Sequence, residues 1–145
     1  MKTIIMKTNK LTIFGDGGSR GNPGPAAFGF VIYDAEMNII HKQGTRIGIN
    51  TNNVAEYSAV ISALEWVEKE GSGSISQIDF FLDSQLVVSQ LTGKFRVKHP
   101  NMIPLFTKVK HLINRVGVPV TFTAVPRAQN SKADEMVNLA LDNQI

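Results

Sequence analysis

The sequence predicts an α/β fold with a five-stranded mixed sheet, three antiparallel strands and then two parallel ones, and helices packed on both faces. Three observations lead to this expectation. The chain opens with three short apolar segments joined by turns, which is typical of an antiparallel meander. Segments with helical spacing then alternate with further strands. Residues 78–82 are apolar almost throughout, as expected of a central strand covered on both faces.

The first half of the chain is expected to supply the meander and one long helix. Strands are predicted over residues 11–14, 27–33 and 39–47, with a turn rich in glycine and proline after the first and a tight connection over 34–38. The helix that follows has capping side chains at its start and apolar residues at helical spacing. The capping residues are Thr51, Asn52 and Asn53, and the apolar ones are Tyr57, Val60, Ile61, Leu64 and Val67. The Gly-Ser segment 71–74 is expected to end this helix.

The second half is expected to add two strands and three helices. Asp83 stands at the carboxyl end of the 78–82 strand, and Ser84 can cap a short helix that reaches Leu91. The remaining predicted elements are a helix over 103–115, a strand from 118 to about 125 and a last helix over 131–142.

The composition is that of an ordinary globular domain. The 145 residues are 43% hydrophobic and 19% charged, with no internal repeat and no domain boundary. We therefore expect one domain over 1–145, with 1–9 as a short N-terminal extension. The absence of cysteine excludes disulfides, thiolate zinc sites and thiol nucleophiles, so a metal would need oxygen or imidazole ligands.

The net charge of +3, from fifteen Lys and Arg against twelve Asp and Glu, is compatible with a polyanionic partner. No apolar run reaches the length of a signal peptide or of a membrane helix. We therefore expect a cytoplasmic protein with no membrane contact. A monomer is also expected, and the length and the initial Met favour a free-standing protein.

Two acidic residues follow predicted strands. Asp16 and Asp83 each close an apolar strand, and ligands of α/β sheets tend to lie beyond the carboxyl ends of strands. If the two strands are neighbours, both carboxylates face one crevice. Glu56 precedes Val60 by four residues, which puts it on or beside the helix face that meets the sheet. A carboxylate in that place is costly without a partner or a cation.

Helical phase selects a fourth carboxylate. Asp134 precedes Val137 by three residues and Leu141 by seven, so it shares their inward face, whereas Glu135 aligns with Asn138 on the polar side. Carboxylates that converge without Lys or Arg beside them repel one another unless a hard cation such as magnesium or manganese lies between them.

Each of these residues also has a purely structural interpretation. The alternatives are a turn former for Asp16, a helix start for Asp83 with Ser84, a first-turn residue favoured by the helix dipole for Glu56, and a capping partner of Ser131 for Asp134.

Four segments resemble, in order, the motifs of the type 1 ribonuclease H family. They are residues 14–25 (FGDGGSRGNPGP), 51–56 (TNNVAE), 83–85 (DSQ) and 125–135 (VPRAQNSKADE). The resemblance extends over residues 11–142. It implies the ribonuclease H-like fold and a metal-dependent endoribonuclease that hydrolyses the RNA strand of RNA–DNA hybrids, leaving 3′-hydroxyl and 5′-phosphate ends.

The resemblance also assigns residues to the site. Asp16, Glu56, Asp83 and Asp134 would hold two Mg²⁺ ions, with Mn²⁺ as a substitute. Short polar side chains would line the minor-groove side of the RNA strand, namely Ser19, Asn22, Asn52 and Gln85, while Thr51 would hold a DNA phosphate. Asn22-Pro23-Gly24 is also a good turn, and Thr51-Asn52 is also a good helix cap.

The sequence departs from the best-known members of this family in two places. Arg127 stands where many members have a histidine; it cannot act as a general base, so its role would be to stabilise phosphate charge or to aid product release. Archaeal and some bacterial members resemble this form. As a surface residue at a strand end, Arg127 also has a structural interpretation.

The second departure is that the basic helix and loop of some members is missing between Leu91 and Ile103. Its place is taken by Lys94, Arg96, Lys98 and His99. Lys98 is predicted to contact the phosphates of the DNA strand, and a solvated basic loop is the alternative.

Two other functions stay open. A hybrid-binding module could have kept the fold and lost catalysis, although the four retained carboxylates argue against this. The second open function is an enzyme that also cleaves double-stranded RNA as a side substrate.

Overall fold

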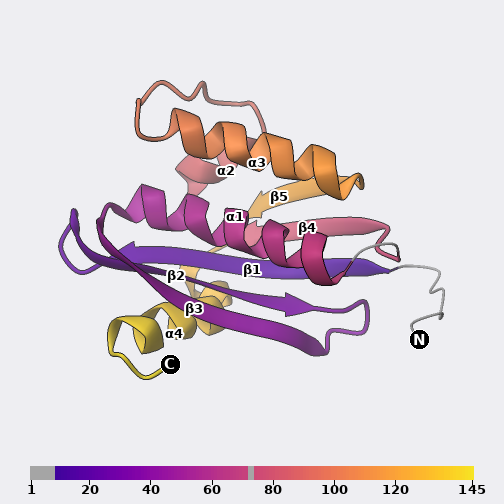
Figure 1. Cartoon of the computed structure of the whole chain (residues 1–145), viewed down its shortest axis with the longest axis horizontal. Helices are drawn as coiled ribbons and strands as arrows, with labels where there is room; N and C mark the ends of the chain where they lie inside the picture. The colour runs from indigo at the N-terminus through magenta and orange to yellow at the C-terminus, as the bar shows by residue number, and fades with distance from the viewer. Residues whose placement is uncertain (1–8, 72–73) are drawn as a thin grey trace.

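The computed structural model describes residues 9–71 and 74–145, which form one five-stranded sheet in the order β3-β2-β1-β4-β5 (Figure 1). The strands are β1 (Lys10–Ser19), β2 (Gly24–Tyr33), β3 (Ile39–Asn50), β4 (Gln77–Leu82) and β5 (Val120–Ala124). The pairs β1–β2 and β2–β3 are antiparallel, whereas β1–β4 and β4–β5 are parallel. This confirms the predicted mixed sheet.

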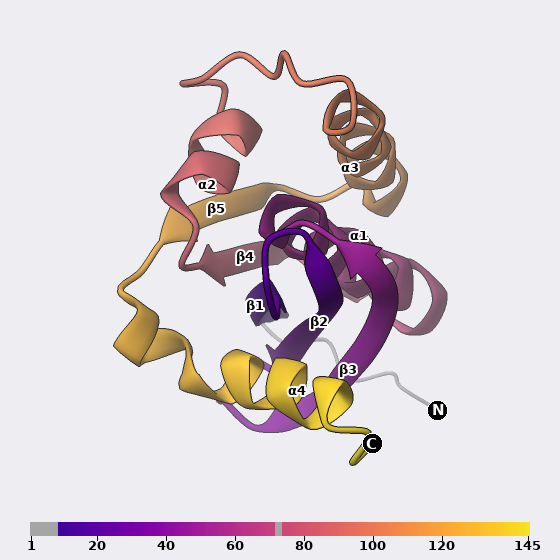
Figure 2. The same cartoon turned by 90° about the vertical axis from the view of Figure 1, so that its left-hand side faces the viewer.

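Helices cover both faces of the sheet, as predicted. They are α1 (Asn52–Glu70), α2 (Gln85–Leu91), α3 (Ile103–Val116) and α4 (Ser131–Leu141), with a 3-10 helix, η1 (Arg127–Asn130), before the last. Seen from the side, α1 and α3 lie on one face and α4 lies on the other (Figure 2). The described residues between α2 and α3 contain no helix, as expected from the missing basic segment between Leu91 and Ile103.

The main core lies between α1 and the sheet. Strand alternation sends every second side chain of β1, β2 and β4 toward it. The fully or nearly fully buried members are Ile13, Phe28, Phe30, Ile32, Ile78, Phe80 and Leu82. The face under α4 carries a smaller cluster of Ala27, Val137 and Ala140, and α4 approaches closely because β2 has Gly29 there. A side-chain carbon at Gly29 would lie 2.7 Å from Met136 Cβ and 2.8 Å from Ala133 O.

Several element boundaries differ from those predicted. The prediction that Asp16 closes its strand is wrong, because β1 continues to Ser19, which is paired with Ala26 of β2. Glycine-rich sequence there looked like a turn, but the antiparallel ladder with β2 keeps it extended, and only residues 20–23 form the turn. For the same reason β2 begins three residues before the predicted position, at Gly24.

The other boundaries agree to within three residues. The helix α2 has the predicted bounds, with Ser84 as its cap, and α1 ends with the Gly71 N–H donating to Val67 O. The expected N-terminal extension over 1–9 lies outside the described residues except for Asn9, whose carbonyl accepts from Ser76 N at 3.2 Å. No described helix combines the length and the apolar character that crossing a membrane requires.

Candidate active site

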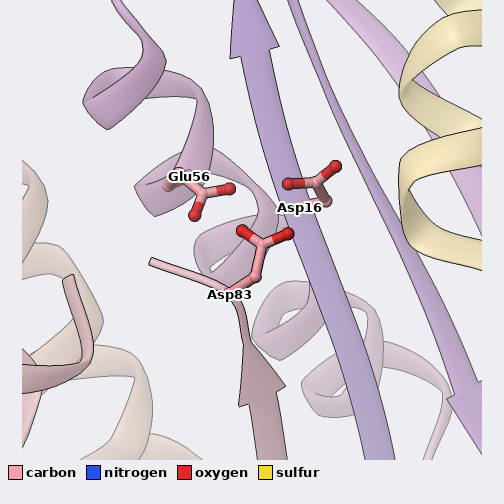
Figure 3. Close-up of side chains that lie close together, drawn as sticks. All are labelled: Asp16, Glu56 and Asp83. Carbon is pink, nitrogen blue, oxygen red and sulfur yellow. The ribbon is translucent and has the colours of Figure 1, made fainter. Parts of the chain in front are cut away.

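Three carboxylates from different elements meet at one place: Asp16 from β1, Glu56 from α1 and Asp83 from the end of β4 (Figure 3). Each offers an oxygen, and these oxygens all lie within 4.8 Å of one another. The topology explains the meeting, since β1 and β4 are parallel neighbours and the register pairs Gly15 with Leu82, one residue before each aspartate. The condition that the two strands be adjacent is therefore met.

The position of Glu56 excludes its purely structural interpretation. The first turn of α1 contains no acidic residue, because the helix begins at Asn52 and Glu56 lies beyond that turn. Its side chain is 4% exposed, and Oε1 accepts a hydrogen bond from the backbone N–H of Gly17 on β1. Oε2 is buried and has no partner among the described residues. A buried carboxylate oxygen without a donor is costly unless a cation completes its surroundings.

Asp134 reaches the same pocket from α4. The pocket is lined by Asp16, Glu56, Asp83 and Asp134, although Asp134 stands outside the group of three whose oxygens are within 4.8 Å. Its carboxylate accepts from Asn138 Nδ2 at 3.3 Å. Glu135 is exposed, so the helical phase that selected Asp134 is confirmed. The capping interpretation of Asp134 finds no support, because the start of α4 has no side-chain capping hydrogen bond.

Burial and mutual repulsion shape the protonation of this cluster. Burial, and then the negative charge of Asp83, raise the pKa of Asp16 from 3.8 to about 7. Burial, and then the charges of Asp16 and Asp83, raise the pKa of Glu56 well above its usual value. Without a cation, burial and mutual repulsion therefore favour the protonated forms of both residues, and Asp16 carries its proton about half of the time near pH 7.

The donor set fits divalent magnesium or manganese. All the candidate ligands are carboxylate oxygens, which hard cations prefer, and Glu56 Oε2 lacks a donor. A cation among them would offset the repulsion that raises the two pKa values.

A pH-dependent stabilisation by metal follows from these pKa shifts. Between about pH 4 and pH 7, folded Asp16 retains a proton that the unfolded chain has released, so the metal-free protein loses stability as pH rises through this window. Mg²⁺ binds the deprotonated carboxylates, so we expect it to raise the Tm clearly at pH 8 and little at pH 5. Thermal unfolding with Mg²⁺ or with chelator, at matched ionic strength, measures this; an equal rise at both values of pH would contradict it.

The polar residues assigned to substrate gather beside the carboxylates, where the 20–23 turn meets the start of α1. Asn52 Oδ1 accepts from the backbone N and the Oγ of Ser19, at 2.8 and 3.1 Å. Asn22 Oδ1 accepts from Asn52 N at 3.0 Å. Ser19 and Asn52 line the pocket, whereas Asn22 is not part of its lining. Asn22 therefore holds the turn against the helix, as the turn interpretation predicts.

Thr51 and Gln85 flank the site at the starts of two helices. Thr51 caps α1, with its Oγ1 accepting from Val54 N at 3.2 Å, so the capping interpretation is correct and the hydroxyl hydrogen stays available to a phosphate. Gln85 is exposed and opens α2 directly after Asp83 and Ser84. Neither belongs to the pocket lining.

The two basic candidates have different positions. Arg127 is exposed, opens η1 and lines the pocket with the carboxylates. Lys98 is exposed in the segment between α2 and α3 and is not part of the pocket lining. The structure therefore brings Arg127 to the carboxylates and leaves Lys98 outside their pocket.

Sequence reasoning missed several residues beside the carboxylates: Arg20, Asn53 and Asn138 line the pocket, and Asp83 is contacted by Asn130. Asn130 is 1% exposed, and its Nδ2 donates to Gly15 O at 2.8 Å and lies 3.4 Å from Asp83 Oδ2. It thus ties the start of α4 to the strand that carries Asp16 and to Asp83. The only signal was its place inside the segment 125–135, four residues before Asp134.

Comparison with known proteins identifies relatives of this chain. The family described as "Reverse transcriptase-like" matches residues 14–140. A ribonuclease HI of Halobacterium salinarum is 41% identical over 128 residues, which are 88% of this chain and 62% of that protein. A bifunctional protein of Mycobacterium tuberculosis is 39% identical over 134 residues, 92% of this chain and 36% of the relative. The chain thus spans about a third of the mycobacterial relative and under two thirds of the halobacterial one.

Solved structures with similar sequences have the same fold. The crystal structure of LC11-RNase H1 in complex with an RNA/DNA hybrid has a TM-score of 0.87 and 41% identity, covering 92% of this chain and 97% of that one. RNase H1 from Halobacterium salinarum has a TM-score of 0.86 and 40% identity, covering 92% and 98%. With the fold, the order of the motifs and the meeting of the carboxylates, these similarities show that the chain belongs to the type 1 ribonuclease H family.

Proposed function

We propose that this chain is an endoribonuclease that hydrolyses the RNA strand of RNA–DNA hybrids with two divalent metal ions, leaving 3′-hydroxyl and 5′-phosphate ends. The observation that carries the proposal is the convergence of Asp16, Glu56 and Asp83, two of them almost fully buried, in a pocket that Asp134 also lines. A protein that only bound hybrid would gain nothing from this uncompensated charge. Magnesium is the expected ion, and manganese is expected to replace it.

The four carboxylates would hold the ions. Two ions bound there would activate the attacking water and stabilise the leaving oxygen of an in-line displacement. Around them, Asn130 fixes the direction of Asp83, and the Gly17 N–H fixes the direction of Glu56. Arg127, at the pocket rim, stabilises phosphate charge and aids product release.

The preference for a hybrid is proposed to come from the polar wall beside the carboxylates. The 2′-hydroxyl is the group that distinguishes RNA from DNA. Ser19 and Asn52 lie in the pocket at the distance of one hydrogen bond from each other, so they can recognise hydroxyls on the strand that is cut. Asn22 and Gln85 are proposed to extend this contact along the RNA strand, and Thr51 and Lys98 to contact DNA phosphates. The complex of LC11-RNase H1 with an RNA/DNA hybrid supports this substrate class.

A cleavage assay with three duplexes tests the proposal. End-labelled RNA–DNA hybrid, duplex RNA and duplex DNA are incubated with the protein and Mg²⁺, Mn²⁺ or chelator. We expect cuts in the RNA of the hybrid with either metal and none with chelator. Cleavage that survives chelation would overturn the metal mechanism, hybrid binding without cleavage would indicate a binding module, and cuts in duplex RNA would add that duplex as a side substrate.

The role of Arg127 gives a milder prediction. Arg127→Ala is expected to lower kcat by about 10-fold, roughly 1.4 kcal/mol of barrier, because a charge at the pocket rim assists but does not hold the ions. Steady-state kinetics on hybrid substrate measures the effect. Arg115→Ala, which removes an exposed arginine paired with Glu68, is the matched control and should retain the wild-type rate. A wild-type rate for Arg127→Ala would remove this residue from the site.

A further inference from the structure

A buried hydrogen bond joins the two helices that adjoin Glu56 and Asp83. Tyr57 Oη donates to Gln90 Oε1 at 2.7 Å, and the two side chains are 0% and 7% exposed. Tyr57 is the residue after Glu56 on α1, and Gln90 lies in the last turn of α2. The bond therefore links α1, which carries Glu56, to α2, which begins two residues after Asp83.

Apolar contacts alone leave the position of α2 loosely specified. The helix has seven residues, and its buried apolar side chains are Val87, Val88 and Leu91. Apolar burial is not directional, so such a short helix can shift against α1 while most of its apolar area stays buried. A hydrogen bond prefers a narrow range of distance and angle. The bond between Tyr57 and Gln90 supplies the direction that the apolar contacts lack.

A shift of α2 would move Asp83. This aspartate lies in the short connection between Leu82 of β4 and Ser84, the cap of α2, whose Oγ accepts from Val87 N at 3.2 Å. Asp83 thus has one chain neighbour held by the sheet and one held by α2, while Asn130 Nδ2 lies 3.4 Å from its Oδ2. Glu56 is held separately, by α1 and the Gly17 N–H.

We infer that Tyr57 and Gln90 are positioning residues, whose hydrogen bond sets the separation of Glu56 and Asp83 and thereby the affinity of the carboxylate pocket for divalent cations. The inference rests on the proposed metal site. Neither side chain is expected to touch substrate or metal, because both are buried between helices.

The test compares single and double replacements. Tyr57→Phe removes the donor and leaves a buried amide oxygen unpaired, so it lowers both stability and the positioning of α2. The double variant Tyr57→Phe/Gln90→Leu removes both polar groups, which is expected to recover stability but not the directional link. Val67→Ala, a cavity at the far end of α1, lowers stability without touching α2 and is the matched control.

The primary measurement is the half-saturating concentration of Mg²⁺ or Mn²⁺, obtained by fitting the rise of Tm with metal concentration L to the linkage relation RT ln(1 + L/Kd), because Tm itself does not level off. The second measurement is kcat on hybrid substrate. For Tyr57→Phe and for the double variant we expect the half-saturating concentration to rise by about 10-fold, as for partners that orient metal ligands, and kcat at limiting metal to fall. Val67→Ala should keep the wild-type half-saturation despite its lower Tm.

Two results would overturn the inference. One is a double variant that recovers wild-type metal affinity together with stability, and the other is an equal shift in Val67→Ala. If Tyr57→Phe does not fold, Gln90→Leu replaces it in the same comparison. Failure of the proposed function is distinguishable, because wild-type protein would then bind metal in the thermal titration without cutting hybrid, and the titration would still decide the role of Tyr57.

Discussion

Asp16→Asn is expected to abolish hydrolysis of RNA–DNA hybrid while the metal-free protein becomes at least as stable as wild type. The rate should fall by roughly 10³-fold or more, equal to about 4 kcal/mol of barrier, because an amide cannot replace a carboxylate ligand among the ions. The stability of the metal-free protein, in contrast, is expected to stay the same or to increase. At pH 8, above its pKa of about 7, Asp16 is charged beside Asp83 and Glu56, and a neutral amide of the same shape relieves that repulsion.

Three measurements separate this expectation from a structural role. Cleavage kinetics, thermal unfolding with chelator, and thermal unfolding with Mg²⁺ are compared for Asp16→Asn, Asp83→Asn and wild type. Both variants should lose the rise in Tm that Mg²⁺ causes, and hybrid binding should persist. Glu135→Gln, which removes an exposed carboxylate from α4, is the matched control and should keep the rate and the rise. Parallel losses of activity and metal-free stability in Asp16→Asn would show that the carboxylate supports the fold instead.

Local signals in the sequence predicted the elements that bring these carboxylates together. Ser84 gave the start of α2 because a capping hydroxyl acts within three residues, and Asp134 was selected over Glu135 because helical phase is local too. The segment around Asp16 was interpreted wrongly as a turn. Its glycines have little preference for a strand, and the partner that keeps them extended, β2, is visible only in the folded protein.

Asn130 could not be predicted because its partners are remote. Gly15 O lies 115 positions away in the chain and Asp83 lies 47 away, so no periodicity links them. Lys98 differs from Asn130, because the sequence singled it out whereas the structure does not bring it to the pocket. Its positive charge, in a segment that departs from the family pattern, led to the prediction that it contacts DNA phosphates. The structure leaves it exposed and outside the carboxylate pocket, so binding measurements have to test it.

Gly17→Ala is expected to damage both stability and activity, because β1 and α1 meet at this glycine. A side-chain carbon there would overlap the carbonyl carbon of Ala55 and the amide nitrogen of Glu56, and would lie 2.6 Å from Ala55 O. Carbon atoms in contact stand about 3.5–4.0 Å apart, so the strand and the helix would have to separate. Forcing extra volume into a packed interior costs about 1–3 kcal/mol, and backbone on the other side leaves little room for relaxation.

The same separation would move Glu56 away from Asp16 and Asp83, since the Gly17 N–H is the donor to Glu56 Oε1. We therefore expect a clear fall in Tm and at least a ~100-fold fall in kcat, because small misplacement of catalytic groups has effects of that size. Gly18→Ala is the matched stability control: its side-chain carbon would meet Val137 Cγ1 at 3.9 Å, an ordinary contact. Equal losses of Tm in the two variants would mean that the loss comes from replacing any glycine in this strand. The close approach of β1 and α1 at Gly17 would then not set the position of Glu56.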